Sequence, residues 1–152
     1  MPLTRAYARV YCDAMQDEFD LCLVMNTRMA ARAVTRLGDR RLRPFGVTAA
    51  QFNIMGMLVT RPGRSISELA QDLAMERTTL SRNLALLERK GLVETAVTGD
   101  GKARVYEIAP AGQTVFDNAV PEWRRSLADL RQALQEPDYQ TIITGLRNIA
   151  RL

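Results

Sequence analysis

Arginines and short hydroxyl side chains gather on one side of a predicted helix over residues 76–90. The polar positions are Arg77, Thr78, Ser81 and Arg82, and the opposite side carries Leu80, Leu84 and Leu87. An arginine can donate two parallel hydrogen bonds to a guanine edge, and a threonine methyl group can contact the methyl group of thymine. Because no bulky apolar residue interrupts the polar side, the pattern predicts a helix that can enter the major groove of DNA.

The sequence contains no histidine, which excludes several kinds of catalytic and metal site. Histidine is the commonest general base and zinc ligand, and it activates the serine or cysteine of many hydrolases. Carboxylates such as Glu136 and Asp138 fall near expected helix ends, where capping and solvation account for them. We therefore expect no enzyme activity, no catalytic residue, no metal ion and no cofactor.

The composition is that of one folded, basic domain. Of the 152 residues, 47% are hydrophobic and 25% are charged. The 21 Lys and Arg residues outnumber the 17 Asp and Glu residues, which gives a formal net charge of +4. This balance favours a polyanionic partner, and double-stranded DNA fits both the charge and the polar helix.

Neither a secretory signal nor a membrane span is expected. Charged residues interrupt the first 25 positions, and the longest charge-free stretch, residues 44–60, is too short to cross a bilayer. Cys12 and Cys22 would stand about 15 Å apart along one helix, which is too far for a disulfide. These features predict a cytoplasmic protein without membrane contact.

Local signals outline the elements that must position the polar helix. Apolar residues at helical spacing predict helices over residues 20–43, 49–60 and 111–134, and a last helix after Asp138. The segment from Ser65 to Glu68 matches a capping box for a short helix that ends near Leu73, and Gly91 is an expected C-cap. Residues 92–97 and 104–108 are rich in β-branched residues and flank a turn-rich segment, which predicts a β-hairpin.

This order of elements is typical of a winged helix-turn-helix, in a mainly α-helical chain with a small β-hairpin wing. In such a fold the short helix over residues 66–73 supports the 76–90 helix in the major groove. The hairpin then reaches the neighbouring minor groove or its phosphates through Lys102 and Arg104. Ser65, at the start of the supporting helix, is a further candidate DNA contact.

Three stretches of the chain resemble the MarR (multiple antibiotic resistance regulator) family, and the resemblance extends over nearly the whole length. They are residues 43–52 (RPFGVTAAQF), 76–93 (ERTTLSRNLALLERKGLV) and 106–112 (YEIAPAG). The resemblance implies a homodimeric repressor that binds a pseudo-palindromic operator and is released by a small-molecule effector. It also implies that residues 1–43 and 110–152 form a helical dimerisation region, and that residues 44–109 form the winged DNA-binding domain.

The family's groove-reading positions carry over onto the polar helix. They fall on Arg77, Thr78, Thr79, Ser81 and Arg82. The wing departs from the family pattern, because members often carry Asp-x-Arg-Asp-x-Arg where this chain has Val97, Gly99, Asp100 and Lys102. One aspartate and the arginine at the tip are missing, so we expect Lys102 and Arg104 to contact mainly phosphates.

Family members commonly sense small phenolic or anionic ligands in a cleft between the dimer helices and the winged domain. The resemblance implies a small aromatic or anionic effector in such a cleft. The residues that could line the cleft are Cys22, Met25, Met29, Phe52 and Met55. Methionine and phenylalanine also fill hydrophobic cores, which is the simpler interpretation of each residue alone. A stripe of arginines at positions 28, 32, 36 and 40 could join such a cleft, although a solvated helix face is the simpler interpretation.

Two alternatives to an effector-controlled DNA-binding regulator remain open at this stage. Peroxide-sensing family members keep a reactive cysteine early in their first conserved helix, so Cys22 could make the protein a redox-sensing regulator. Against this, residues 24–43 contain no tyrosine that would serve as a hydroxyl partner. The second alternative is a winged-helix module that binds proteins and not DNA.

Overall fold

The computed structural model describes residues 15–16, 18–97 and 104–151, so Cys12 and Lys102 lie outside the described part of the chain. The chain divides into two compact units, residues 1–37 and 38–152. The helix α2 (Leu23–Leu42) begins in the first unit and ends in the second. It starts three residues later than predicted, and the Asn26 side chain donates to the backbone carbonyls of Asp20 and Cys22 just ahead of it.

The first unit buries little of its predicted apolar stripe. The side chains of Leu21 and Met29 are 85% and 52% exposed, whereas Met25 and Leu37 are half-buried. The arginines at positions 28, 32 and 36 are all exposed, as a solvated helix face would require. The first unit therefore does not bury the apolar side of α2 by itself.

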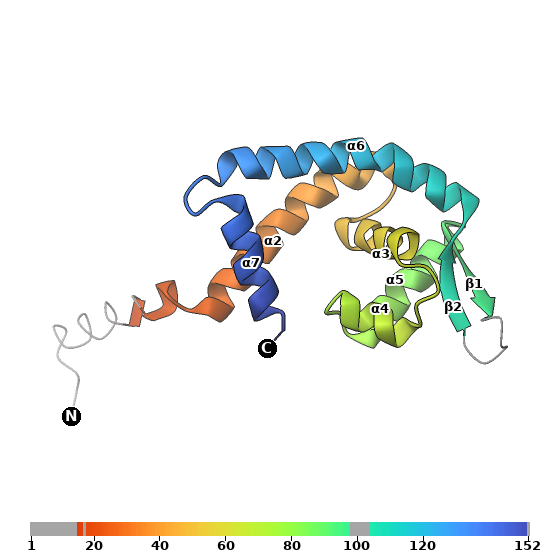
Figure 1. Ribbon diagram of the computed structural model, residues 1–152, viewed down its shortest axis with the longest axis horizontal. Helices are drawn as coiled ribbons and strands as arrows, with labels where there is room; N and C mark the ends of the chain where they lie inside the picture. Colours follow the sequence, from red (N-terminus) through yellow and green to blue (C-terminus); the bar gives the residue numbers. More distant parts are fainter. Residues whose placement is uncertain (1–14, 17, 98–103, 152) are drawn as a thin grey trace, which may run out of the picture. The chain divides into compact units, whose positions relative to one another are not determined.

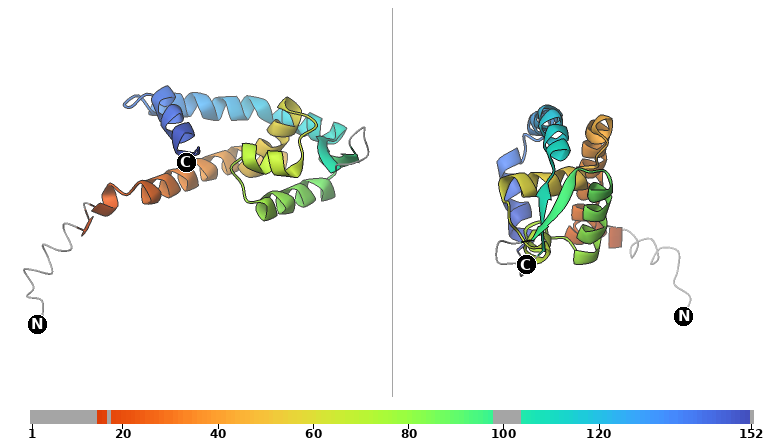
Figure 2. Two further views of the ribbon diagram at one scale, coloured as in Figure 1. Left: turned by 60° about the horizontal axis from the view of Figure 1, so that its bottom comes forward. Right: turned by 90° about the vertical axis from the view of Figure 1, so that its right-hand side faces the viewer.

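The second unit follows the predicted order of helices and hairpin (Figures 1 and 2). A short 3-10 helix η1 (Arg43–Phe45) precedes α3 (Ala49–Thr60), α4 (Ile66–Asp72) and α5 (Arg77–Arg89). The strands β1 (Val93–Val97) and β2 (Arg104–Ile108) form an antiparallel hairpin, and α6 (Pro110–Ala133) and α7 (Tyr139–Ile149) complete the chain. The mainly helical fold with a small β-hairpin is confirmed, with boundaries within two residues of those predicted for these elements.

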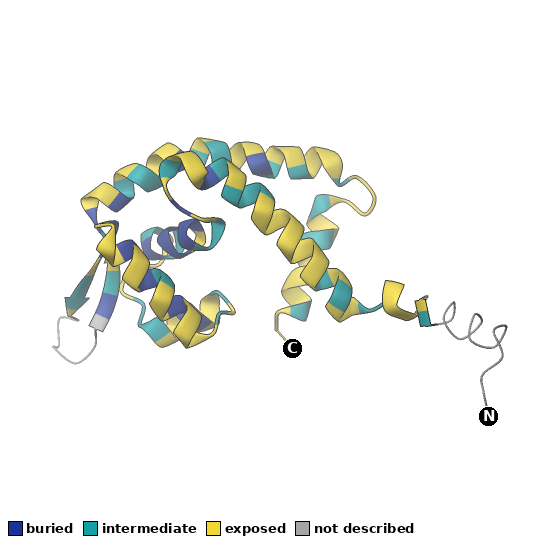
Figure 3. Cartoon of the chain, turned by 180° about the vertical axis from the view of Figure 1, so that it is seen from behind, coloured by how far each residue is buried: buried dark blue, intermediate teal, exposed yellow. Residues whose placement is uncertain are grey.

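The hydrophobic core lies among α3, α4, α5 and the hairpin. Figure 3 shows buried positions concentrated in these elements, whereas α7 has none. The fully buried side chains include Ile54 and Met55 from α3, Leu69 from α4, and Leu80, Leu84 and Leu87 from α5. The leucine side of α5 is thus buried in the core, and this determines which side of the helix faces outward.

Both predicted helix starts before α5 are capped as the sequence indicates. The Thr48 hydroxyl accepts from the Gln51 amide while the Gln51 side chain accepts from the Thr48 amide. At α4, the Ser65 hydroxyl accepts from the Glu68 amide at 3.3 Å and the Glu68 carboxylate accepts from the Ser65 amide at 2.9 Å. These reciprocal bonds satisfy donors that a helix N-terminus otherwise leaves unpaired.

The end of α5 closes in a Schellman motif around Gly91, whose φ is +67°. The Leu92 amide donates to the Leu87 carbonyl and the Gly91 amide donates to the Glu88 carbonyl, both at about 3 Å. The hairpin starts directly afterwards, with Val93 opposite Ile108 and Val97 opposite Arg104. An isolated bridge between Ser65 and Val105 joins the hairpin to the start of α4.

The capping box at α4 predicts a pH dependence of stability. Hydrogen bonds from the Ser65 amide and hydroxyl, together with the Arg64 guanidinium, lower the pKa of Glu68 below its ordinary value. A lowered pKa in the folded state gives stabilisation that is full above the ordinary glutamate pKa and is lost as the pH falls through the lowered one. In urea unfolding, the difference in unfolding free energy between the wild type and Glu68→Gln should therefore be largest near neutral pH and shrink below about pH 4. A difference that stays constant down to about pH 3 would contradict this.

Candidate nucleic-acid interface

The outward side of α5 carries the residues predicted to read DNA. All five predicted positions are exposed: Arg77, Thr78, Thr79, Ser81 and Arg82. Their neighbours Leu80 and Leu84 are 0% exposed. The fold therefore leaves the polar side of α5 uncovered over its N-terminal half, as a groove-binding helix requires.

The hydrogen bonds of this face leave its guanidinium donors available. The Ser81 hydroxyl donates to the Arg77 carbonyl at 2.7 Å, so its oxygen can still accept a bond from outside. Within residues 15–16, 18–97 and 104–151, neither Arg77 nor Arg82 forms an ion pair. Both guanidinium groups can therefore donate to base edges or phosphates without first breaking an ion pair in that part of the chain.

The N-terminus of α5 adds a positive partial charge to the same face. The N-cap residue Glu76 makes no side-chain hydrogen bond to the first turn, and that turn contains no acidic residue. The amide groups at the start of this helix are therefore not capped by a side chain, and they favour an anionic group such as a DNA phosphate.

A cavity of about 460 Å³ lies between α3 and α6, and we call it the aromatic cavity. It is lined by Phe52, Asn53, Gly56, Met57, Thr60, Leu73, Phe116, Val120, Trp123 and Arg124. The rings of Phe52 and Phe116 stack with centroids 4.9 Å apart, and the Trp123 ring lies 6.1 Å from Phe52. Apolar rings together with the exposed residue Arg124 suit an aromatic ligand that carries a negative charge.

Comparison with known proteins identifies the family of the chain. Residues 45–103 match a model of the MarR family. The transcriptional regulator MosR of M. tuberculosis, solved in complex with DNA, is 32% identical, with a TM-score of 0.77. The aligned region covers 86% of this chain and 94% of MosR. The chain belongs to the MarR family. The resemblance noted in the sequence and the winged helix-turn-helix fold are both confirmed.

Two further MarR-family structures share the fold at lower identity. A mutant of MarR from E. coli, complexed with operator DNA, is 21% identical with a TM-score of 0.74, and the alignment covers 84% of this chain and 92% of that one. CouR from Rhodococcus jostii RHA1, bound to p-coumaroyl-CoA, is 13% identical with a TM-score of 0.75, and the corresponding shares are 87% and 94%. Among curated proteins, none matches the chain significantly.

Membership in the MarR family makes the protein a DNA-binding transcription regulator and places it among regulators, not among enzymes. None of the helices in residues 15–16, 18–97 and 104–151 has the length and apolar character of a membrane span.

The structure gives Ser65 an internal role in this MarR-family domain. Its hydroxyl accepts from the Glu68 amide and donates to the Glu68 carboxylate at 2.8 Å. Beside it, Arg64 pairs with Glu68 and Asp72, and Arg61 pairs with Asp72 at 3.2 Å. Capping accounts for Ser65, and its contact with DNA stays a prediction.

The wing is described only up to the base of its tip. Arg104 starts β2 opposite Val97, next to residues 98–103, which include Lys102 and lie outside the described residues. The Arg104 backbone lies at the outer end of the hairpin, which agrees with a contact between the wing and DNA. The phosphate contacts of Lys102 and Arg104 stay predictions.

The five residues predicted to line an effector cleft fall in different surroundings. Cys22 and Met25 are half-buried and Met29 is exposed, all in the first unit. Phe52 lines the aromatic cavity, whereas Met55 is 0% exposed within the hydrophobic core, so packing alone accounts for it. The redox role of Cys22 also stays a prediction.

The sequence did not indicate the residues that complete the aromatic cavity. The apolar spacing over residues 111–134 predicted a helix and assigned none of its residues to a cavity. A signal was present, because Phe116, Val120 and Trp123 recur at helical spacing on α6 and two of them are aromatic. Nothing local to α6 indicates that this stripe meets Phe52 of α3.

Proposed function

We propose that the protein is a repressor that binds a pseudo-palindromic operator as a homodimer, with one α5 in the major groove of each half-site. The observation that carries this proposal is the exposed polar face of α5, where Arg77, Thr78, Thr79, Ser81 and Arg82 include two guanidinium groups that no described carboxylate pairs. The DNA complex of MosR, at 32% identity, supports the same use of this domain.

Uncovered apolar side chains on the terminal helices support dimerisation. α7 carries Tyr139, Ile142, Ile143, Leu146 and Ile149, yet no residue of α7 is buried in the single chain. Val24 and Val34 of α2 are 67% and 49% exposed. Exposed apolar surface of this extent marks an interaction site, and a two-fold dimer would cover it with a second copy of the same helices.

This proposal divides the chain by role. Residues 44–109 would bind DNA, and residues 1–43 and 110–152 would form the dimer. A two-fold axis through the terminal helices would set the two copies of α5 about 34 Å apart, which is one turn of DNA.

Selection of bound sites from random duplex DNA tests the proposed function. We expect an inverted repeat to be enriched, with half-site centres about 10 base pairs apart or a multiple of that spacing. Enrichment of a single, non-repeated half-site would contradict the dimer. No enrichment, with no retention of duplex DNA at all, would favour the protein-interaction module.

We propose further that the aromatic cavity holds a small aromatic or anionic effector that releases the operator. The three aromatic rings and Arg124 support this, and CouR provides a MarR-family example bound to p-coumaroyl-CoA. The arrangement suits an aromatic acid, whose ring would contact Trp123 and whose carboxylate would pair with Arg124.

Substitutions at the rim of the aromatic cavity should uncouple the effector from the operator. In a thermal-shift screen of aromatic and acyl acids, compounds that stabilise the wild type should also weaken its operator binding. Trp123→Leu and Arg124→Gln should lose about tenfold in affinity for those compounds while binding the operator normally without them. A response that persists unchanged in both variants, or a broad library without any effect, would contradict an effector at this cavity.

A further inference from the structure

The C-terminal end of α5 is bonded to the turn that joins α2 to α3. The Lys90 ammonium, at the C-cap of α5, donates to the Gly46 carbonyl at 2.7 Å and lies 3.5 Å from the Gln51 side-chain oxygen. Gln51 is 4% exposed, and the same oxygen accepts from the Thr48 amide in the capping box of α3. One ammonium group therefore connects the end of α5 to both the turn and the start of α3.

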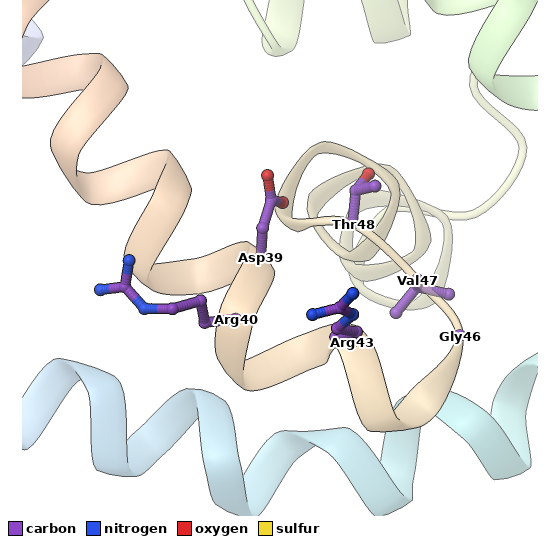
Figure 4. A pocket seen from close by; sticks show the side chains of 6 residues that line it. All are labelled: Asp39, Arg40, Arg43, Gly46, Val47 and Thr48. Atoms are coloured by element: carbon purple, nitrogen blue, oxygen red, sulfur yellow. The ribbon is translucent and has the colours of Figure 1, made fainter.

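The turn at Gly46 is itself held by hydrogen bonds. Gly46 has a φ of +72°, which residues with a side chain rarely adopt, and its amide donates to the Arg43 carbonyl at 3.0 Å. Across the turn, the Asp39 carboxylate of α2 accepts from the Ala49 amide at 2.7 Å. Figure 4 shows the pocket that this turn lines, with Asp39 beside the start of α3 and Gly46 at the bend. The Lys90 bond therefore ends on a well-defined stretch of backbone.

Within the described residues, the other side-chain hydrogen bonds of α5 stay inside the helix. Ser81 donates to the Arg77 carbonyl, and Asn83 donates to the Thr79 carbonyl. No ion pair joins α5 to another element in the same part of the chain. Besides Lys90 and the continuing backbone, buried leucines hold α5 in place, and apolar contacts lack the directionality of a hydrogen bond.

The Lys90 bond lies at the opposite end of α5 from the predicted DNA-reading positions. From Lys90 to Arg77 the helix axis is about 20 Å long. A tilt of about 10° at the C-cap would move Arg77 by about 3.4 Å, which is the rise of one base pair. In a dimer, a shift of this size in each α5 changes the separation of half-sites that both helices can read at once.

We propose that Lys90 is a positioning residue that determines which half-site spacing the protein accepts. Its bond to Gly46 connects α5 to the segment, residues 43–48, that joins the winged domain to the predicted dimerisation region. The inference rests on the proposed function, because half-site spacing has a meaning only for a dimer on an inverted repeat. Lys90 acts through the direction of α5, which carries Arg77 and Arg82, and not through a base contact of its own.

Distances between the two copies of α5 test this positioning without DNA. A nitroxide label on Thr78→Cys, in a Cys12→Ser and Cys22→Ser background, should give one narrow distance distribution by double electron–electron resonance. Adding K90M should widen the distribution at least about twofold, because the directional bond is lost. K90R should restore it, because a guanidinium can donate to the same carbonyl. The matched control R89Q, which removes an exposed arginine without an ion pair in the described chain, should leave it unchanged.

Operators whose half-site centres are moved by one base pair in either direction test the consequence for DNA binding. The wild type should bind the selected spacing at least about tenfold more tightly than either neighbour, because one base pair also rotates a half-site by about 35°. In K90M this preference should fall to about threefold or less, while the affinity for a duplex with a single half-site stays that of the wild type. K90R and R89Q should keep the wild-type preference.

The outcomes separate the role of Lys90 from the proposed function. A K90M dimer with the wild-type distance distribution, or with an unchanged spacing preference, would overturn the positioning role and leave the dimeric regulator intact. An equal loss of affinity on every spacing and on the single half-site would also overturn it, because misfolding or a lost phosphate contact weakens binding to all of these duplexes. Absence of a dipolar signal in the wild type, together with no inverted repeat, would overturn the proposed dimer and this inference with it.

Discussion

Replacing Arg82 by alanine is expected to weaken binding to the selected operator by about tenfold to a hundredfold per half-site. The Arg82 side chain is exposed on the N-terminal half of α5 and has no ion pair in the described chain, so its donors are free for a guanine edge. Arg77→Ala should act in the same direction. Fluorescence anisotropy at one fixed salt concentration measures the loss.

Comparing the loss of affinity for the operator with that for random duplex DNA shows whether these arginines read bases. Binding to random duplex should fall much less than binding to the operator, because only one charge contact is lost there and the salt dependence changes by about one unit. Arg89→Ala is the matched control, because Arg89 is an exposed arginine in the last turn of the same helix. An equal loss on operator and random duplex would make Arg82 a phosphate contact and contradict base reading.

Replacing Gly112 by alanine is expected to lower the free energy of unfolding by about 3 kcal/mol or more. A Cβ atom at this position would lie 1.9 Å from the Leu92 carbonyl oxygen and 3.0 Å from the Ile108 side chain. That oxygen cannot move away easily, because it accepts from the Ala109 amide and Leu92 itself is held by the Schellman motif. The junction between α5, the hairpin and α6 would have to open.

Gly145→Ala is the matched control for this steric argument. Gly145 lies inside α7, and a Cβ atom there would meet nothing within 4 Å. Alanine at this helical position should be neutral or stabilise by up to about 1 kcal/mol. Urea unfolding of both variants checks the prediction, and a similar effect at the two glycines would contradict it.

The parts of the fold that depend on local chemistry could be predicted from the sequence. Ser65 and Gly91 set helix ends through bonds within a few residues, and each lies at the predicted cap; Thr48 likewise caps the predicted helix over 49–60. The leucine spacing of α5 likewise determines its outward side before any tertiary contact is known. The candidate DNA-reading residues could therefore be predicted from the residue spacing within one helix.

Features that need distant segments to meet could not be predicted in the same way. The aromatic cavity forms because Phe52 of α3 meets Phe116 of α6, and the turn before α3 is tied to α5 by the bond from Lys90 to Gly46. Neither contact leaves a periodic pattern in the sequence. Met55 is 0% exposed in the hydrophobic core, so packing accounts for this methionine, and its place in an effector cleft stays a prediction.

Photocrosslinking from α5 to DNA is the most direct measurement of whether its exposed face reads the operator. A benzophenone on Thr78→Cys, in a Cys12→Ser and Cys22→Ser background, should crosslink to bases within both half-sites of the selected repeat. The same label on Asn118→Cys, an exposed position of α6, should give no such crosslink. Operator binding without any crosslink from position 78, or with equal crosslinking from position 118, would show that another surface holds the DNA.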